Sequence, residues 1–297
     1  MHAIVARSAL SPNVTRLVVA APRIAQVRRP GQFVIVRRGP GAERIPLTIA
    51  DADPAAGTIS LVIQAVGAST GDLVALAPGD AIADVAGPLG TPTDLLTAGH
   101  AVCVGGGVGT AVVHPIAAGL AAAGARVTSI IGGRSAPWVI YADELARYGA
   151  TVVCTDDGTL GRHGLVTDAL REMLDTGDVD RVYAVGPVPM MRAAGALAAE
   201  HGVPVVVSLN AIMVDGTGMC GGCRVVVGGE TRYACVDGPE FDGAAVDFGL
   251  LADRLATYRS FEQAATQRRA CRLAGRIPEA DPADRAAAAP APAEARS

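Results

Sequence analysis

Short apolar runs alternate with turns containing Gly or Pro along the first third of the chain. The clearest β-branched runs cover 14–19, 32–36 and 58–64, and turns such as Pro30-Gly31 and Pro78-Gly79 punctuate them. Short strands that recur between such turns are typical of a small barrel or sandwich. The pattern therefore predicts an all-β domain, a small β-barrel, over residues 1–97.

The pattern changes after residue 98, where continuous apolar runs alternate with Ala-rich helical segments. Buried strands of this kind indicate a parallel sheet with helices on both faces, that is, an α/β nucleotide-binding domain over 98–207. The predicted strands cover 101–104, 127–131, 151–153, 181–185 and 203–207. The predicted helices cover 111–123, 142–148, 167–174 and 190–200.

The remaining third of the chain has a different composition. Residues 208–248 are Gly-rich and hold three of the six cysteines, and residues 250–270 are predicted to be helical. We assign 208–270 to a small metal- or cluster-binding region with a C-terminal helix. The Ala-, Pro- and charge-rich residues 271–297 are predicted to be a disordered tail.

Composition excludes several classes of function. The net charge is −4, which argues against a nucleic-acid binder that neutralises phosphates. All 25 basic residues are Arg, so a Schiff-base lysine and a lysine-bearing P-loop are excluded. The start of the chain lacks the features of a signal peptide, and the uncharged run 95–125 is interrupted by Gly105-Gly106-Gly107 and His114-Pro115. We expect a soluble cytoplasmic protein with no membrane span.

The strongest chemical signal is a cysteine-rich loop with the spacing D-x4-C-x2-C-x11-C, formed by Asp215, Cys220, Cys223 and Cys235. The plant-type [2Fe–2S] loop has the spacing C-x4-C-x2-C with a distant fourth cysteine, so Asp215 stands in the first position. Four glycines between 215 and 222 let the loop wrap a cluster. A zinc site and a set of unrelated buried thiols are the alternatives.

A second signal is a glycine-rich turn between a predicted strand and a predicted helix. Glycines there let the backbone approach a diphosphate, which the helix N-terminus favours electrostatically. Tight packing alone would also require glycine. The candidate cofactor contacts in this turn are Gly105, Gly106, Gly107 and Gly109.

Four further segments are weaker candidates. In the β-domain, the segment with Arg44, Pro46, Leu47 and Thr48 offers a cation and a hydroxyl for a flavin, although an ordinary strand has the same residues. Two loops follow strands of the α/β domain, where ligands of such sheets bind, although both are also typical of simple turns. A further candidate phosphate contact comprises Gly67, Ser69 and Thr70, and the two loops contribute Asp156 and Asp157, and Gly186 and Met190.

Together these motifs resemble one family. The order R-I-P-L-T, GPLG, GGGVG, TDDG, GP-x-x-MM and then the cysteine loop is similar to the flavin/iron–sulfur electron-transfer subunits of the ferredoxin–NADP reductase superfamily. These include the electron-transfer subunit of dihydroorotate dehydrogenase. The small subunits of sulfide dehydrogenase and of NADH-dependent ferredoxin:NADP oxidoreductase are more similar still, from Val207 to Cys220 and from Cys235 to Asp242. The resemblance covers about residues 1–265.

The resemblance implies FAD in the barrel, NAD(H) on the α/β domain and a [2Fe–2S] cluster near the C-terminus. It gives Thr48 the role of the hydroxyl that faces flavin N5, and it makes the chain an electron-transfer subunit of a heterodimer or heterotetramer. Its partner would be a larger flavin/iron–sulfur oxidoreductase subunit, with ferredoxin as a further partner. NADP(H) stays open because Arg134 follows the second strand of the α/β domain, where it would meet a ribose phosphate.

One departure from the superfamily concerns the flavin motif. Arg44 lies four positions before Thr48 rather than three, and Leu47 replaces the usual aromatic residue. Leu47 would cover a flavin face without stacking on it. Asp215, by contrast, is a feature of the more similar subgroup and separates this chain from the four-cysteine dihydroorotate subunits. The alternative functions are a dihydroorotate dehydrogenase electron-transfer subunit, a stand-alone NADH diaphorase and a non-enzymatic cluster- or zinc-binding assembly subunit.

Overall fold

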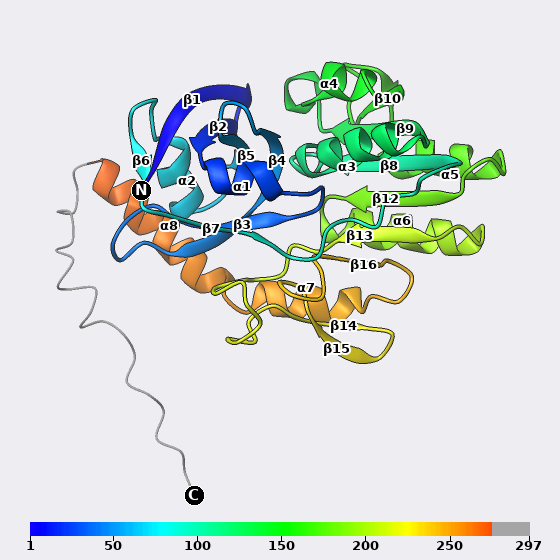
Figure 1. Cartoon of the computed structure of the whole chain (residues 1–297). Coiled ribbons are helices and arrows are strands. Elements are labelled where there is room, and N and C mark those ends of the chain that lie inside the picture. The colour runs from blue at the N-terminus through cyan, green and yellow to red at the C-terminus, as the bar shows by residue number, and fades with distance from the viewer. Residues whose placement is uncertain (275–297) are drawn as a thin grey trace, which may run out of the picture.

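The computed structural model describes residues 1–274 and confirms the predicted barrel (Figure 1). Its sheet is antiparallel throughout, with the strand order β6-β1-β2-β5-β4-β3-β7. Two short helices, α1 (Pro22–Val27) and α2 (Ala68–Val74), pack on it. The strands are β1 (His2–Ser11), β2 (Val14–Ala20), β3 (Phe33–Arg37), β4 (Arg44–Asp53), β5 (Thr58–Gln64), β6 (Ala81–Ile82) and β7 (Asp84–Leu89).

Strand β3 connects the barrel to the rest of the molecule. Side chains alternate across a strand, so Val34 and Val36 pack inside the barrel, while Phe33 and Ile35 point outward. Both outward side chains are nevertheless buried, because the α/β domain and the cysteine-rich region cover this face. The barrel wall is therefore also one wall of the interface between the parts of the chain.

The second sheet confirms the predicted α/β domain. Its strand order is β11-β10-β9-β8-β12-β13-β16, and all pairs are parallel except β13–β16. Strand β16 comes from the cysteine-rich region and extends the edge of this sheet. The strands are β8 (His100–Gly106), β9 (Arg126–Gly133), β10 (Ala150–Thr155), β11 (Arg162–His163), β12 (Arg181–Val185), β13 (Val205–Ser208) and β16 (Glu240–Asp242).

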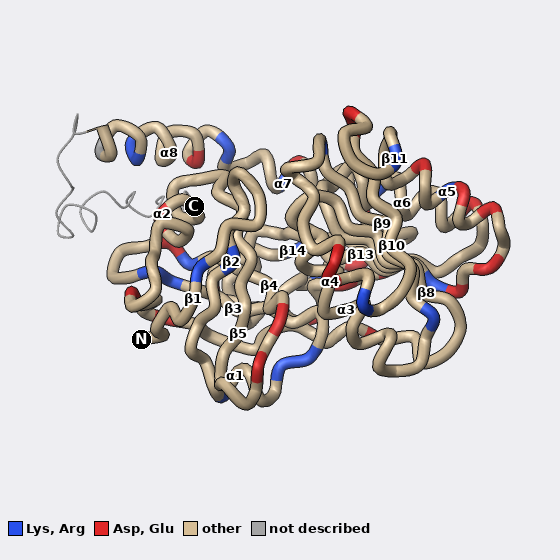
Figure 2. The backbone as a smooth tube through the Cα atoms, turned by 90° about the horizontal axis from the view of Figure 1, so that it is seen from above, with Lys and Arg blue, Asp and Glu red and all other residues tan. Residues whose placement is uncertain are grey.

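Helices cover both faces of this sheet, as the apolar strand sequences predict. Helices α3 (Gly109–Ala123) and α4 (Ala142–Ala146) pack on one face, and α5 (Val166–Asp175) and α6 (Val188–Glu200) pack on the other. The short 3-10 helix Ala136–Trp138 follows β9. In this domain, Figure 2 shows charged residues chiefly on the helices and loops around the sheet. The central parallel strands carry charge only at their first residues, Arg126 and Arg181.

The cysteine-rich region contains the hairpin β14 (Arg224–Val227) and β15 (Glu230–Tyr233) and the helix α7 (Phe248–Ala256). The predicted helical stretch 250–270 is confirmed except at residues 257 and 258, where α7 ends before α8 (Arg259–Leu273) begins. The Thr257 hydroxyl donates to the Asp253 carbonyl at 3.2 Å, which satisfies an acceptor at the end of α7. Helix α8 includes residues 271–273, which were assigned to the tail, and the rest of that predicted tail, 275–297, lies outside the described residues.

Among residues 1–274, no helix is both long enough and apolar enough to cross a membrane.

Candidate functional site

A cleft of about 710 Å³ lies between the barrel and the α/β domain. The ends of β8, β9, β12 and β13 line it, so it lies at the carboxyl ends of the parallel strands, where open α/β sheets bind their ligands. The strand arrows of the parallel sheet point toward the barrel in Figure 1. Residues of the barrel, including β3 and β4, therefore line the same cleft as the glycine-rich turn.

Thr48 and Pro46 line the barrel side of this cleft. Thr48 pairs in register with Phe33 of β3, whose ring lines the same cleft. Leu47, between them in sequence, packs against the barrel core because neighbouring side chains on a strand point to opposite faces. The structure thus brings Thr48 and Pro46 into the candidate site and turns Leu47 away from it.

The glycine-rich turn lines the opposite side, and its four glycines differ in role. A Cβ on Gly109 would collide with the Val185 carbonyl, and a Cβ on Gly105 would lie 2.9 Å from Thr110. These two glycines are required for packing, and Gly105 does not line the cleft. Gly107 has φ +56°, and no atom lies within 4 Å of the position that its Cβ would take. The backbone at Gly107 is therefore open to the cleft. Gly106 lies against Met190.

The loops after the other parallel strands supply further lining. Asp156, Gly186 and Met190 line the cleft, as does Arg134 after β9. Asp157 does not line it; its carboxylate accepts hydrogen bonds from the backbone and hydroxyl of Thr159, at 3.0 and 2.6 Å, and these bonds lower the pKa of Asp157. Asp157 therefore holds its own turn in this structure.

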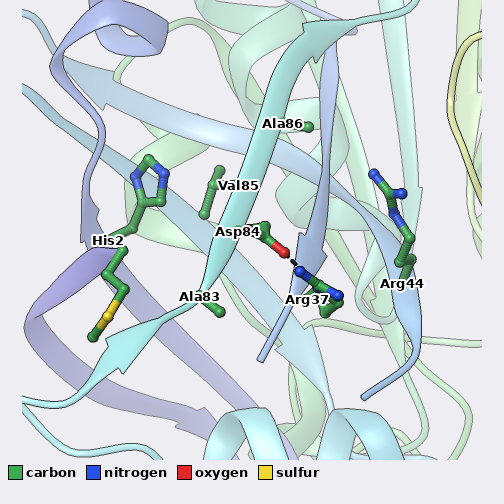
Figure 3. A pocket seen from close by; sticks show the side chains of 8 residues that line it. His2, Arg37, Arg44, Ala83, Asp84, Val85 and Ala86 are labelled. Atoms are coloured by element: carbon green, nitrogen blue, oxygen red, sulfur yellow. Dashed lines mark hydrogen bonds and ion pairs between the residues drawn. The ribbon is translucent and has the colours of Figure 1, made fainter. Parts of the chain in front are cut away.

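Arg44 lies outside the cleft, at the start of β4. Figure 3 shows that it lines a second cavity of about 540 Å³ together with His2, Arg37 and Asp84. Arg37 pairs with Asp84 and, with a smaller contribution from the charge of Arg44, lowers the pKa of that carboxyl. Thr48, Pro46 and Arg44 are spaced two residues apart on β4 and so share one face of the strand.

The predicted phosphate contact at the start of α2 also lies outside the cleft. The Thr70 hydroxyl accepts the backbone N–H of Gly67 at 3.0 Å, so it is engaged within its own turn. The Ser69 hydroxyl donates to Glu43, the residue that precedes Arg44. The structure therefore brings Ser69 and Arg44 to one end of β4, beyond Pro46.

Several residues that line the cleft are not among those predicted from the sequence. The segment between β13 and the cysteine loop forms one wall, and two barrel side chains, Asn13 and Gln64, form part of another. The first group lies in the stretch from Val207 to Cys220 that carries the family resemblance, but none of its residues was assigned to a cofactor. The second group had no signal in the sequence. The missed residues of the first wall are Ser208, Leu209, Asn210, Ala211 and Met213, with Pro239 beside them.

The cysteine loop continues directly from this wall. Asp215 accepts the backbone N–H of Thr217 at 2.9 Å and of Cys220 at 2.8 Å, and these bonds lower the pKa of its carboxyl. Gly216, Gly218 and Gly221 all have positive φ, which lets the loop fold back on itself. Gly216 packs so closely on Ile35 and Leu89 that a Cβ would lie within 3 Å of both.

Two of the predicted ligands are buried side by side. The Cys223 and Cys235 sulfurs are 3.2 Å apart, and the backbone N–H of Cys235 lies 3.5 Å from the Cys223 sulfur. Burial, together with the neighbouring thiol, raises the pKa of Cys235 to about 12. A Cys235 thiolate therefore requires a positive charge, such as that of a metal ion, beside it.

The other two predicted ligands lie at the rim of the same loop, where Cys220 is exposed. No three His, Cys, Asp or Glu side chains of residues 1–274 converge closely enough to hold a metal ion in this structure. The residues nevertheless fit an iron–sulfur cluster in donor chemistry: two adjacent thiols, a third on a glycine-rich loop, and loop amides that reach sulfur, such as Gly222 N–H to Cys220 Sγ at 3.5 Å. The ligand set stays a prediction.

A buried carboxyl lies where the three parts of the chain meet. Glu240 of β16 accepts a hydrogen bond from the Thr93 hydroxyl at 2.8 Å, and its second oxygen is buried without a hydrogen-bond partner. A Cβ on Gly31 would lie 2.8 Å from the Glu240 carboxyl, so the glycine at this position leaves room for that carboxyl. Burial raises the pKa of Glu240 to about 7.

We expect Glu240→Gln to stabilise the protein at pH 8 and to leave its stability unchanged at pH 4. The folded pKa lies above the unfolded value of about 4.3, so ionisation of Glu240 destabilises the fold as pH rises between them. The full difference above pH 7 is on the order of 3–4 kcal/mol at most. Thermal unfolding of holoprotein across this pH range measures it, with exposed Glu230→Gln as the control for lost charge. An equal effect at both pH values would contradict the prediction.

Both the cysteine-rich region and the chain as a whole match known proteins. Residues 210–247 match the family described as the iron-sulfur cluster binding domain of dihydroorotate dehydrogenase B. The chain is 43% identical, over 90% of its length and 95% of the relative, to the Thermotoga maritima dihydroorotate dehydrogenase B (NAD(+)) electron transfer subunit homolog. It is 35% identical, over 82% of its length and 96% of the relative, to that electron transfer subunit from Geobacillus thermodenitrificans.

The chain belongs to the family of dihydroorotate dehydrogenase B electron transfer subunits. Among solved structures, a chain of NADH-dependent reduced ferredoxin-NADP oxidoreductase, from a study of flavin-based electron bifurcation, matches with a TM-score of 0.86 and 43% identity. That match covers 90% of this chain and 97% of the other. The Amycolatopsis cytochrome P450 reductase matches with a TM-score of 0.58 at 21% identity, covering 67% of this chain and 65% of the other, which shows the fold alone.

Family membership confirms the resemblance, the reductase fold and the function as an electron-transfer subunit. The comparisons also support the predicted cofactor classes: a flavin, a pyridine nucleotide and an iron–sulfur cluster. The match at 210–247 contains all four predicted ligands from Asp215 to Cys235.

Proposed function

We propose that this chain takes electrons from NADH onto FAD and passes them through a [2Fe–2S] cluster to a larger flavin/iron–sulfur partner subunit. One observation carries the proposal: a single cleft joins Thr48 of the barrel, the Gly107 turn and the wall at 208–213 that runs into the cysteine loop. A hydride donor, a flavin and a one-electron centre would thus be neighbours. The partner subunit would determine the direction of electron transfer.

The residues of the cleft have separate tasks in this proposal. Gly107 would leave room for the nucleotide diphosphate at the start of α3, and Thr48 would hold the reacting edge of the flavin. A flavin that extends along β4 would then reach Arg44 and Ser69 with its own diphosphate. When bound, the flavin accepts a hydride and releases single electrons, so the protein need supply only position and potential.

The partner surface is proposed to lie over the cysteine loop. Three apolar side chains are exposed around it: Val214, Met219 and Val236, with Met219 89% exposed. Apolar groups gathered on a surface mark interaction sites. Asp215 in the ligand set favours a partner of the ferredoxin:NADP oxidoreductase or sulfide dehydrogenase type over dihydroorotate dehydrogenase. We also propose a cytoplasmic location, which the six free cysteines support.

The isolated chain is expected to retain about one FAD without a covalent bond, which denaturation releases, and NADH is expected to bleach it. Turnover with a physiological acceptor should require the partner subunit, because a cluster at the surface transfers electrons only to a docked redox centre. Flavin absorbance, iron and sulfide content, and co-purification of the partner from native cells test these points. A colourless chain that cannot be reconstituted would reject the proposal, and full turnover without a partner would favour a diaphorase.

A further inference from the structure

A half-buried arginine of helix α7 contacts the cysteine loop. The Arg254 guanidinium donates a hydrogen bond to the backbone carbonyl of Gly222 at 3.0 Å. Gly222 lies between Cys220 and Cys223, two of the predicted cluster ligands. The contact therefore joins a helix that carries no predicted ligand to the segment of the loop that connects two ligands.

Packing fixes the position of the helix that carries Arg254. Asp247 caps the start of α7, where its carboxylate accepts a backbone N–H of the first turn at 2.9 Å. Leu251 is buried in the same core cluster as Cys223 and Cys235. Arg254 follows Leu251 by three residues, so both side chains lie on the same face of α7. Helix α7 also contacts β14, the strand that follows Cys223 (Figure 1).

The hydrogen bond also orients the peptide that precedes Cys223. The peptide bond between Gly222 and Cys223 is trans, so its carbonyl and its N–H point in opposite directions. Because the carbonyl is bound to Arg254, the Cys223 N–H points away from the guanidinium. The preceding amide, Gly222 N–H, lies 3.5 Å from the Cys220 sulfur. Arg254 therefore fixes the backbone between two sulfur ligands.

A second guanidinium lies against the neighbouring glycine. A Cβ on Gly221 would lie 2.8 Å from Nη1 of Arg224, and Gly221 has φ +66°. Arg224 is exposed to solvent, whereas Arg254 is half-buried. Two positive charges are thus held beside the segment between Cys220 and Cys223, and solvent screens the charge of Arg254 less than that of Arg224.

We propose that Arg254 raises the reduction potential of the [2Fe–2S] cluster and positions its ligand loop, with a smaller electrostatic contribution from Arg224. The proposal rests on the proposed function, which places the cluster in this loop. Uptake of one electron makes a cluster and its ligands more negative by one charge, and no bond forms or breaks. A fixed positive charge nearby stabilises that reduced form, most strongly where solvent screens it least. Arg254 is a positioning residue, because it acts on the cluster through the loop and through its charge.

The test uses Arg254→Gln, Arg254→Lys and Arg224→Gln in the full chain with its cofactors bound. Gln keeps a donor for the Gly222 carbonyl but removes the charge, whereas Lys keeps the charge. In Arg254→Gln, reduction of the cluster should become about tenfold less favourable, which is about 59 mV for a one-electron couple. Arg254→Lys should restore most of the wild-type potential. Arg224→Gln should give a smaller shift that disappears in about 1 M salt. Redox titration followed by EPR measures all three potentials.

Arg232→Gln is the matched control for a lost positive charge. Arg232 lies on β15 in the same region and pairs with Glu230 at 2.7 Å. Its substitution leaves the hydrogen bond between Arg254 and Gly222 in place. The potential of this variant should therefore stay close to that of wild type. A shift as large as that of Arg254→Gln would show that any charge in the region has the same effect, and it would overturn the assignment to Arg254.

The remaining outcomes separate this inference from the proposed function. A wild-type chain that binds zinc, or no metal, in place of a cluster would reject the proposed function itself. A cluster in Arg254→Gln with the wild-type potential would overturn this inference alone. If Arg254→Gln loses the cluster and Arg254→Lys retains it, the charge is required and the inference stands. If both variants lose the cluster, Arg254 has a structural role only, and its assignment to the potential is overturned.

Discussion

NADH will reduce the bound flavin at least about 100-fold more slowly once Gly107 carries a valine side chain, while FAD stays bound. The Cβ position of Gly107 has no neighbour within 4 Å, so the new side chain would occupy the space proposed for the diphosphate. The left-handed backbone at φ +56° adds a local strain of about 1–2 kcal/mol. Stopped-flow bleaching of flavin absorbance measures the rate, and flavin content measures retention.

Gly109 provides the contrast for this experiment. A side chain there would collide with the carbonyl of Val185, so Gly109→Val is expected to disrupt packing of α3 on the sheet and to lower FAD retention as well. Gly107→Ala should give an intermediate rate because it adds one methyl group. Loss of FAD in Gly107→Val would show that this turn supports the fold, and an unchanged rate would place the diphosphate elsewhere.

Asp215→Cys is expected to keep a [2Fe–2S] cluster but to change its reduction potential and the EPR spectrum of its reduced state. If Asp215 ligates iron, the exchange replaces an oxygen ligand by a thiolate, and ligand type and local charge set the potential. Asp215→Ala should leave an open coordination position and a labile cluster, with FAD and NADH binding intact. Redox titration followed by EPR, with iron and sulfide analysis over time, measures both effects.

In the alternative interpretation, Asp215 is a turn residue and does not bind iron. Its two carboxylate oxygens then serve only to accept the Thr217 and Cys220 amides, as they do in the structure. Asp237 is the matched control, because its carboxylate accepts the Tyr233 amide at 2.7 Å in the same region. If Asp215→Cys and Asp237→Asn both leave the potential and the spectrum unchanged, Asp215 is a turn residue and the fourth ligand lies elsewhere.

The buried strands of the α/β domain were predictable because parallel strands covered on both faces are apolar along their whole length. Strand β1 was not predictable from its sequence. Four of the six residues after His2 are exposed, so the strand lacks a regular alternation of buried and exposed positions, and a bulge interrupts its pairing with β2. Strand β4 was ambiguous for a similar reason: it starts with exposed Arg44 and carries charge again at Asp51 and Asp53. Half-exposed strands have weak hydrophobic patterns, and pairing with neighbours decides them.

The candidate site was predictable where chemistry depends on spacing and not where it depends on tertiary contact. The cysteine spacing and the glycine turn were visible in the sequence, and Thr48 was reached through family resemblance. Asn13 and Gln64 were invisible, because nothing local distinguishes a polar residue that faces a cleft from one that faces solvent. Arg44 was named for its motif, and only the structure shows that it lies outside the cleft that Thr48 lines.

The cysteine-rich region is joined to both other parts of the chain by backbone pairing. Strand β16 is hydrogen-bonded into the edge of the parallel sheet, the Thr91 amide donates to the Gly238 carbonyl at 2.6 Å, and Gly216 packs on the barrel strand β3. A region that is hydrogen-bonded into the edge of a sheet does not move as a separate domain between an electron donor and an electron acceptor. The distance between the cleft and the cysteine loop is therefore fixed when the chain folds. Any control over the timing of electron transfer must come from association and dissociation of the partner.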